Sequence, residues 1–257
     1  MYYKDSGIIL NSYHAAEADK IATVLLRQHG KMNLVFKGVK KSKSHKLNSA
    51  DIGNLVELLF YRKNEHQLPY VREIVVKNHF YKLKKDYTKF LYLNLISELF
   101  LYISLPGDVN QPLYNFLLNI LIRLKEIEYR SIPVFLVFIL YKLVQLLGIM
   151  PEFTQCGKCR RSFHTVYYNK RDNDFYCERC STGFQDDLIP ITPSLQQDIQ
   201  KVQACTITSL DRLRLPAQRE SILIDIFYHI LCRYLNKDLR SYPILEEMMK
   251  NEHIAHC

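Results

Sequence analysis

Hydrophobic and polar positions divide the chain into an early part with short strand-like runs and a later part with helical periodicity. Up to about residue 80, β-branched and aromatic runs alternate with polar connections, and His29-Gly30-Lys31 is typical of a hairpin turn. Five such closely spaced strands predict a small barrel of the OB type. The run from Leu55 is short enough to be helical as well. The five runs are Gly7–Tyr13, Ile21–Leu26, Met32–Phe36, Leu55–Tyr61 and Val71–Lys77.

From about residue 84 the hydrophobic period becomes that of a helix. The stretch Leu113–Ile127 has an unbroken i, i+3, i+4 stripe and follows Asn110, a residue type that caps helices. Phe90–Ile103 and Pro133–Leu147 are apolar on nearly every side, so other helices must surround them. The pattern therefore predicts a helical bundle. Its later members are expected after Thr192, Pro216 and Ser241.

Composition indicates a folded protein that attracts polyanions. The hydrophobic share is 48% and the charged share 24%, both close to globular averages. The net charge is +9, and residues 1–80 contribute 13 Lys and Arg against 7 Asp and Glu. This excess favours nucleic acid or anionic lipid as a partner. Neither GxxxxGK[ST] nor GxGxxG occurs, which disfavours P-loop ATPases and Rossmann dehydrogenases.

The apolar segments do not predict export or membrane insertion. The first six residues carry charge where a signal peptide needs an apolar stretch. The longest apolar stretch, Ile132–Met150, is interrupted by Lys142 and Gln145, whereas a membrane span needs about 20 mostly apolar residues. We therefore expect a cytoplasmic protein with reduced thiols.

Four cysteines have the spacing of a zinc site. Two C-x2-C pairs, Cys156 with Cys159 and Cys177 with Cys180, are separated by seventeen residues. Four thiolates from two such turns can surround one tetrahedral Zn²⁺. The residues between the pairs predict a two-stranded ribbon, and so small a hairpin would depend on the metal for its folding.

The cysteine pattern has three other interpretations. A disulfide pair is disfavoured in a reducing cytosol, and a C-x-x-C redox motif normally follows a βαβ pattern that is absent here. A catalytic zinc would keep one position for water, which a complete Cys₄ set does not leave. We expect one structural Zn²⁺ per chain. The other three cysteines are expected to be ordinary thiols. His164 is expected to be a residue of the ribbon and not a metal ligand.

A lysine-rich segment follows the third predicted strand. Residues 37–46 contain five lysines, which repel one another unless a polyanion neutralises them. The alternative is an ordinary solvated loop. OB folds combine a basic groove with aromatic stacking, and aromatic residues that are individually more typical of a core lie near this segment. The lysines are Lys37, Lys40, Lys41, Lys43 and Lys46, and the aromatic residues are Tyr13, Phe36, Phe60 and Tyr61.

No catalytic motif accompanies these features. The chain has no GxSxG, HExxH or HxE…PCxxC arrangement, and its nine histidines are scattered. We therefore expect a protein that is not an enzyme.

Taken together, these motifs resemble the RecO family of bacterial recombination mediators over nearly the full length. The matching residues are Gly7-Ile8-Ile9-Leu10, Glu17, Asp19, Gly30-Lys31, residues 37–44, Leu146 to Pro151, the four cysteines, Arg233 to Asn236 and Leu239-Arg240-Ser241. One departure is Val39, where small residues are common in the family. The resemblance implies an α+β fold: an OB-fold domain at 1–80, a helical domain formed by 81–155 and 184–257, and a Cys₄ zinc ribbon at 156–183.

The resemblance also implies a function. Such a protein binds single- and double-stranded DNA, anneals complementary strands, and works with RecR to help RecA replace single-strand-binding protein on DNA. Lys37, Lys40, Lys41 and Lys43 would face DNA, and Lys142 is a candidate contact for the acidic C-terminal tail of single-strand-binding protein. Nucleoid association in the cytoplasm is expected.

Two further hypotheses remain from the sequence. The first is a zinc-ribbon adaptor in transcription or translation that contacts protein rather than DNA, and it predicts polymerase or ribosome pull-down without annealing. The second is a zinc-dependent hydrolase, which predicts turnover lost on chelation.

Overall fold

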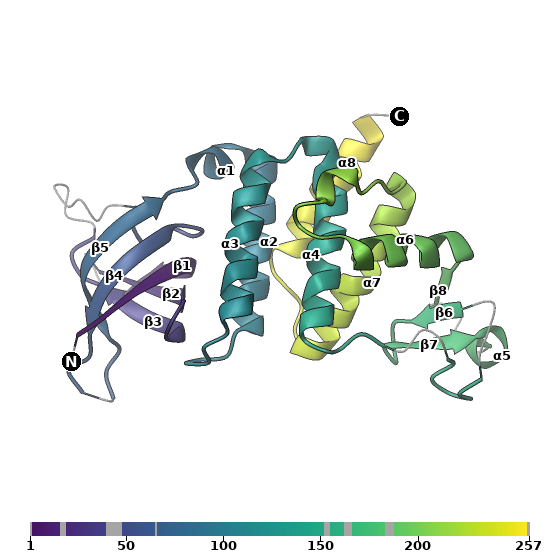
Figure 1. The fold of residues 1–257 in the computed structure, drawn as a ribbon, viewed down its shortest axis with the longest axis horizontal. Coiled ribbons are helices and arrows are strands. Elements are labelled where there is room, and N and C mark those ends of the chain that lie inside the picture. The colour runs from purple at the N-terminus through teal and green to yellow at the C-terminus, as the bar shows by residue number, and fades with distance from the viewer. Residues whose placement is uncertain are drawn as a thin grey trace. The chain divides into compact units, whose positions relative to one another are not determined.

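In the computed structural model, strands make up the first third of the chain and helices most of the rest (Figure 1). The structure describes residues 2–15, 19–39, 48–64, 66–151, 155–161, 166–182 and 188–255. They form two compact units: Met1–Glu126 together with Leu239–Cys257, and Ile127–Asp238. The predicted α+β class is confirmed.

Five strands at the start of the first unit form a closed barrel. Their order is β1-β2-β3-β5-β4, and β1 pairs with both β2 and β4. All pairings are antiparallel except the short one between β3 and β5. The segment whose pattern was ambiguous, Leu55–Tyr61, is strand β4. The strands are β1 (Tyr2–His14), β2 (Lys20–Leu26), β3 (Gly30–Phe36), β4 (Leu55–Tyr61) and β5 (Tyr70–Asn78).

The barrel is filled by alternate side chains of its strands. Along β4, Val56, Leu58 and Phe60 are buried, whereas the residues between them are partly exposed. This period of two sends one set of side chains into the core and the other to the outer face. The inward-facing set joins residues of the other strands in one hydrophobic cluster.

The barrel is attached to the helices of its own unit at Gly30 and Lys31. Gly30 has φ +66°, and a side chain there would collide with the backbone of Asp108. The Nζ of Lys31 donates to the carbonyl of Leu101 at 2.6 Å, and the Gly107 N–H donates to the carbonyl of Lys31 at 3.0 Å. The hairpin between β2 and β3 therefore lies against the loop between α2 and α3.

Side-chain oxygens accept backbone N–H groups at the starts of α2, α3 and α8 in the first unit. The carboxylate of Asp86 accepts the Lys89 N–H at the start of α2, and the Asn110 side chain accepts the Leu113 N–H at the start of α3, as predicted. The Glu98 carboxylate accepts the N–H groups of Arg240 and Ser241 and so holds the start of α8 against α2. The helices are α1 (Tyr81–Lys85), α2 (Tyr87–Ile103), α3 (Gln111–Glu126) and α8 (Tyr242–Ala255).

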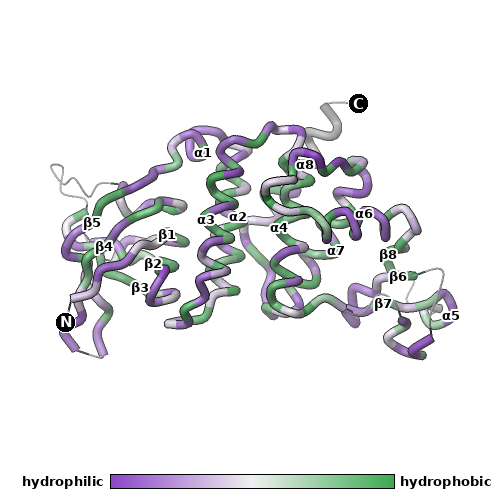
Figure 2. Tube along the Cα trace, viewed as in Figure 1, coloured by the Kyte–Doolittle hydropathy of each residue, from purple (hydrophilic) through white to green (hydrophobic). Residues whose placement is uncertain are grey.

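The second unit is organised around one nearly all-apolar helix. Eleven of the 15 residues of α4 (Ile132–Leu146) are buried, and α4 packs against α6 (Pro193–Ala204) and α7 (Ala217–Leu235). Figure 2 shows hydrophobic residues along this helix. Among the described residues, Tyr129–Leu146 is long and apolar enough for a membrane span, but 61% of it is buried, as in a core helix.

The two compact units group the elements differently from a division by type of secondary structure. The first unit contains the barrel with α1, α2, α3 and α8, whereas the second contains α4, α6, α7 and the small sheet. This grouping reflects contacts between residues that are far apart in the sequence, such as Lys31 with Leu101 and Glu98 with Arg240. The domain boundaries expected from the sequence stay a prediction.

Candidate metal centre and nucleic-acid interface

The ribbon that carries the cysteines is a three-stranded sheet. Strands β6 (Val166–Asn169) and β7 (Asp174–Cys177) form the expected hairpin. Strand β8 (Leu188–Ile191) pairs with the other edge of β6, so the sheet has one strand more than predicted. The four residues Leu-Ile-Pro-Ile give too short a pattern to reveal this strand from sequence.

The first cysteine pair lies on a tight turn that is fixed to the ribbon. The Arg160 N–H donates to the Cys156 carbonyl at 2.7 Å, and the Cys156 N–H donates to the Arg161 carbonyl at 3.0 Å. The Gly157 N–H donates to the Phe175 carbonyl of β7. A side chain at Gly157 would meet the carboxylate of Asp174, so the turn packs closely against the start of β7.

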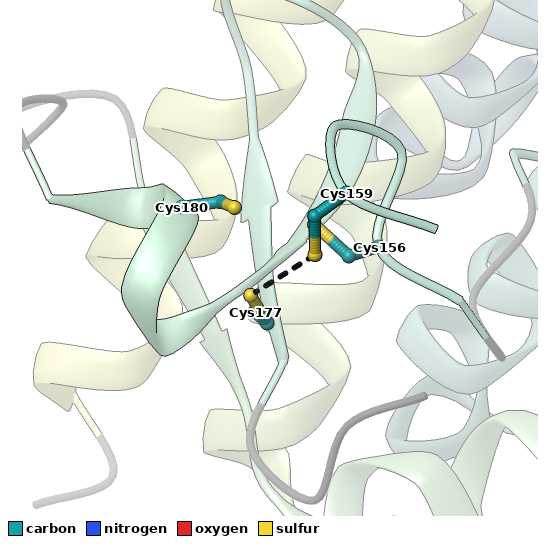
Figure 3. Close-up of side chains that lie close together, drawn as sticks. All are labelled: Cys156, Cys159, Cys177 and Cys180. Atoms are coloured by element: carbon teal, nitrogen blue, oxygen red, sulfur yellow. Dashed lines mark hydrogen bonds between the residues drawn. The ribbon is translucent and has the colours of Figure 1, made fainter. Parts of the chain in front are cut away.

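The second pair comes from the end of β7 and the short helix α5 (Glu178–Ser181), and the four sulfurs converge (Figure 3). All four Sγ atoms lie within 4.8 Å of one another, and those of Cys159 and Cys177 are 3.9 Å apart. Tetrahedral Zn²⁺ with bonds of about 2.3 Å requires sulfurs about 3.8 Å apart. The residues therefore fit a metal ion, and zinc is compatible with the donor set.

The electrostatics of the cluster also favour a bound cation. Burial acts to raise the pKa of Cys156, but backbone N–H groups of Cys159, Cys177 and Lys158 donate to its sulfur and lower that pKa to about 6. The pKa of Cys180 is raised to about 12 by desolvation and by the neighbouring thiols. Like charges that share a site cannot all ionise without compensation, and a divalent cation removes this conflict.

Helix α7 holds the turn at the far end of the ribbon. Lys170 forms an ion pair with Asp225 at 2.7 Å, and the ring N–H of His229 donates to the Lys170 carbonyl at 2.6 Å. Arg233 donates to the Arg171 carbonyl at 3.1 Å. The ribbon is therefore braced against a helix of its own unit. Sequence reasoning did not identify these contacts, because their partners are about 60 residues apart.

The lysine-rich segment leaves the barrel at a fixed point. Lys37 is exposed, and its Nζ lies 4.5 Å from the centre of the Tyr70 ring. The Gly38 N–H donates to the Asp19 carboxylate at 2.8 Å, and Val39 is 1% exposed within the barrel core. The valine that departs from the family pattern thus anchors the segment. Lys40, Lys41, Lys43 and Lys46 lie outside the described residues.

After the lysine-rich segment, the described chain resumes at Asn48, which is hydrogen-bonded to the barrel residue Asn54. The side-chain amide of Asn54 is buried and donates to the carbonyls of Asn48 and Ser49 at 2.7 and 3.0 Å. The Nζ of Lys84 donates to the side-chain Oδ1 of Asn54, and burial lowers the pKa of Lys84 to about 8. The described residues before and after positions 40–47 are therefore held by the barrel and by α1.

The aromatic residues near the segment fall into two groups. Phe36 and Phe60 are each 1% exposed and belong to the barrel core, so they cannot stack on a ligand. Tyr13 is 52% exposed, and Tyr61 lies on the outer face, where it contacts Tyr2 and Tyr70. Sequence reasoning missed these last two tyrosines, because each stands at a strand end and only the register aligns them.

A second basic region lies in the other unit. Lys142 of α4 donates to the carbonyl of Gln203 at 3.0 Å. Next to this carbonyl, Ala204 lines a cavity of about 440 Å³ that combines cationic and apolar side chains. The lining residues are Lys201, Ala204, Cys205, Ser209, Arg212, Leu213 and Arg214.

Comparison with known proteins covers almost the whole chain. The family model for the recombination protein O N terminus matches residues 1–80, and that for the C terminus matches residues 84–243. The DNA repair protein RecO of Bacillus subtilis is 26% identical over 260 residues, which covers 99% of this chain and 98% of the relative. That of Thermodesulfovibrio yellowstonii is 26% identical over 222 residues, 84% of this chain and 86% of the relative. That of Caldanaerobacter subterraneus subsp. tengcongensis is 28% identical over 188 residues, 72% and 74% respectively. With both models matched in order, the chain belongs to the RecO family, whose role is in DNA repair and recombination.

Proposed function

We propose that this protein is a recombination mediator without enzymatic activity that binds single- and double-stranded DNA and anneals complementary strands. The observation that carries the proposal is the lysine-rich segment, whose described neighbours on both sides are bonded to the barrel, in a chain that belongs to the RecO family. Family membership also favours this role over the adaptor and hydrolase hypotheses.

The chemistry required is charge neutralisation rather than bond making. Two complementary strands repel each other through their phosphates, and bound lysines release the condensed counterions and let the strands approach. Base pairing then supplies the specificity. The ammonium groups bind phosphates without reading sequence.

Replacing Lys40, Lys41 and Lys43 by alanine should weaken DNA binding about equally for all sequences. If five lysines contact a single strand, log K should fall with log salt at a slope of about −3.5, and the triple variant should lower that slope by about 2. The measurement is fluorescence anisotropy of a labelled oligonucleotide across a salt series, together with an annealing assay.

A matched variant separates local contacts from net charge. Lys82→Ala, Lys85→Ala and Lys237→Ala remove the same three charges from exposed sites outside the segment. The proposal expects these changes to leave affinity within about twofold. Equal losses in the two triple variants, or a slope near zero for the unmodified protein, would contradict it.

We further propose that the four cysteines hold one structural Zn²⁺. The ion would be bound by Cys156, Cys159, Cys177 and Cys180. By coordinating all four thiolates it would link the two cysteine turns. Four thiolates complete the coordination shell, so the proposal assigns the ion a role in folding rather than in hydrolysis.

The proposed partners are RecR, the acidic C-terminal tail of single-strand-binding protein and, indirectly, RecA, with the protein acting in the cytoplasm at the nucleoid. The cavity beside Ala204 supports the tail contact, because Arg212 and Arg214 can pair with carboxylates while Leu213 offers an apolar surface. Lys142 reaches the same region through Gln203.

The tail contact can be tested with a labelled peptide that has several aspartates and a free apolar C-terminal residue. Lys142→Glu combined with Arg214→Glu should weaken its binding at least about tenfold, because two attractions become repulsions. Lys82→Glu combined with Lys85→Glu is the matched control and should have little effect. The contact is refuted if both double variants bind the peptide as the unmodified protein does.

A further inference from the structure

Three tyrosines form a continuous row on the outer face of the barrel. Tyr2 of β1 is paired in register with Tyr61 of β4, and Tyr61 is paired with Tyr70 of β5. Their ring centres are 5.4 and 5.9 Å apart. Tyr2 is 55% exposed, and the other two are partly exposed. The row therefore crosses three neighbouring strands at one level.

A cation lies over the ring at each end of this tyrosine row. The Nζ of Lys37 is 4.5 Å from the centre of the Tyr70 ring, and the guanidinium of Arg72 is 5.3 Å from the centre of the Tyr2 ring. Arg72 also donates to the Tyr2 hydroxyl at 2.9 Å. Lys37 is the first lysine of the lysine-rich segment. These contacts hold positive charge at the level of the rings, where the phosphates of a bound strand would run.

This composition matches single-stranded nucleic acid better than an apolar partner. Cations flank the aromatic surface, and single-strand-binding surfaces combine a basic track with rings on which bases stack. In a duplex the bases are paired and stacked on one another, so their faces cannot reach tyrosines on a convex barrel. The lysines contact phosphates, which single and double strands share.

We infer that the row Tyr2, Tyr61 and Tyr70, flanked by Lys37 and Arg72, stacks on unpaired DNA bases and gives the protein a preference for single strands over duplex. This inference rests on the proposed DNA-binding function and adds a second kind of contact to it. Lysines give affinity for both forms of DNA, whereas the tyrosine row acts on single strands alone.

The test compares Tyr61→Leu combined with Tyr70→Leu against the unmodified protein, with labelled dT20 and a 20-base-pair duplex as probes. Stacking of bases on aromatic rings adds to affinity, so dT20 affinity should fall at least about tenfold. Duplex affinity should stay within twofold, and the salt slope should not change. Tyr61→Phe combined with Tyr70→Phe keeps the rings and should retain dT20 affinity.

A matched control removes two exposed tyrosines elsewhere in the same unit. Tyr81 and Tyr87 are 59% and 67% exposed, and replacing both by leucine should leave binding to both probes unchanged. Equal losses for dT20 and duplex in the Tyr61 and Tyr70 variant, or no loss for either, overturn the inference. If the unmodified protein binds neither probe, it is the proposed function that fails.

A crosslinking experiment on the unmodified protein covers the case in which the leucine variant does not fold. Oligonucleotides with 5-bromouracil crosslink to aromatic residues that lie against the base, and mass spectrometry locates the attachment. Crosslinks at Tyr2, Tyr61 or Tyr70 support the inference. Crosslinks confined to other residues overturn it.

Discussion

The barrel and the cysteine ribbon hold their strands together in different ways. The barrel closes on itself and fills its interior with a cluster of buried side chains from all five strands. The ribbon has three strands of four residues each, with a core of a few residues such as Tyr168 and Phe175. Small sheets bury too little apolar surface to be stable alone. We therefore expect the stability of the barrel to come from buried apolar surface, and that of the ribbon to come from its converging thiols and from contacts with α7.

The largest expected effect is loss of the proposed zinc ion. Cys156→Ser, or chelation, should unfold the ribbon while the barrel persists, since structural zinc supplies about 10–16 kcal/mol in small zinc domains. Hydrogen exchange should show lost protection in β6 and β7 and unchanged protection in β2. Elemental analysis under reducing conditions should give one zinc per chain.

Cys205→Ser provides the control for this loss. Cys205 is buried and lies outside the four-cysteine cluster, so its replacement should leave the zinc content unchanged. A Cys156→Ser protein that still binds one zinc and keeps the protection of β6 would show that the ribbon does not depend on the thiols.

The next largest effect concerns the barrel core. Phe60 is 1% exposed and packs against Tyr3 and His29, with ring centres 5.5 Å apart in both cases. Phe60→Ala should lower the free energy of unfolding of the barrel by about 3–5 kcal/mol, because it leaves a cavity. Urea unfolding followed by hydrogen exchange in β2 and β4 measures this loss.

Phe60→Ala should leave the zinc content unchanged. Loss of the metal should likewise leave the barrel folded. Tyr13→Ala, at an exposed site on β1, should change stability by no more than about 0.5 kcal/mol. If Phe60→Ala releases zinc, the two regions do not have separate sources of stability.

The smallest effect is a pH dependence in the helices that support the ribbon. Glu220, in the first turn of α7, is 9% exposed, and burial raises its pKa to about 7. The charged form is therefore disfavoured in the folded protein. Its contribution to stability is fully present below about pH 4.5 and is lost as the pH rises through about 7.

Glu220→Gln should flatten this dependence between pH 4.5 and 8. Thermal unfolding midpoints of the second unit, measured for both proteins across that range, test the effect. The expected difference is that the unmodified protein loses stability with rising pH more steeply than the variant. Parallel curves for the two proteins would rule out Glu220 as the titrating group.

Local patterns predicted a large part of this fold. The five strands lie where the β-branched and aromatic runs predicted them, except that β1 begins at Tyr2, five residues earlier than predicted. Asn110 caps α3 through its side chain. Thr192 likewise accepts the Leu195 N–H at the start of α6. The four cysteines converge as their spacing predicted. These features depend on contacts within a few residues or on a spacing that one metal ion dictates.

The order of strands and helices, the thiol cluster and the excess of positive charge follow from the order of the amino acids. The row of Tyr2, Tyr61 and Tyr70, the inward-facing Phe36 and Phe60, and the pairing of β8 with the ribbon depend on how the chain folds in three dimensions. The physical reason is that period and propensity act along the chain, whereas strand register, barrel closure and helix docking depend on partners tens of residues away.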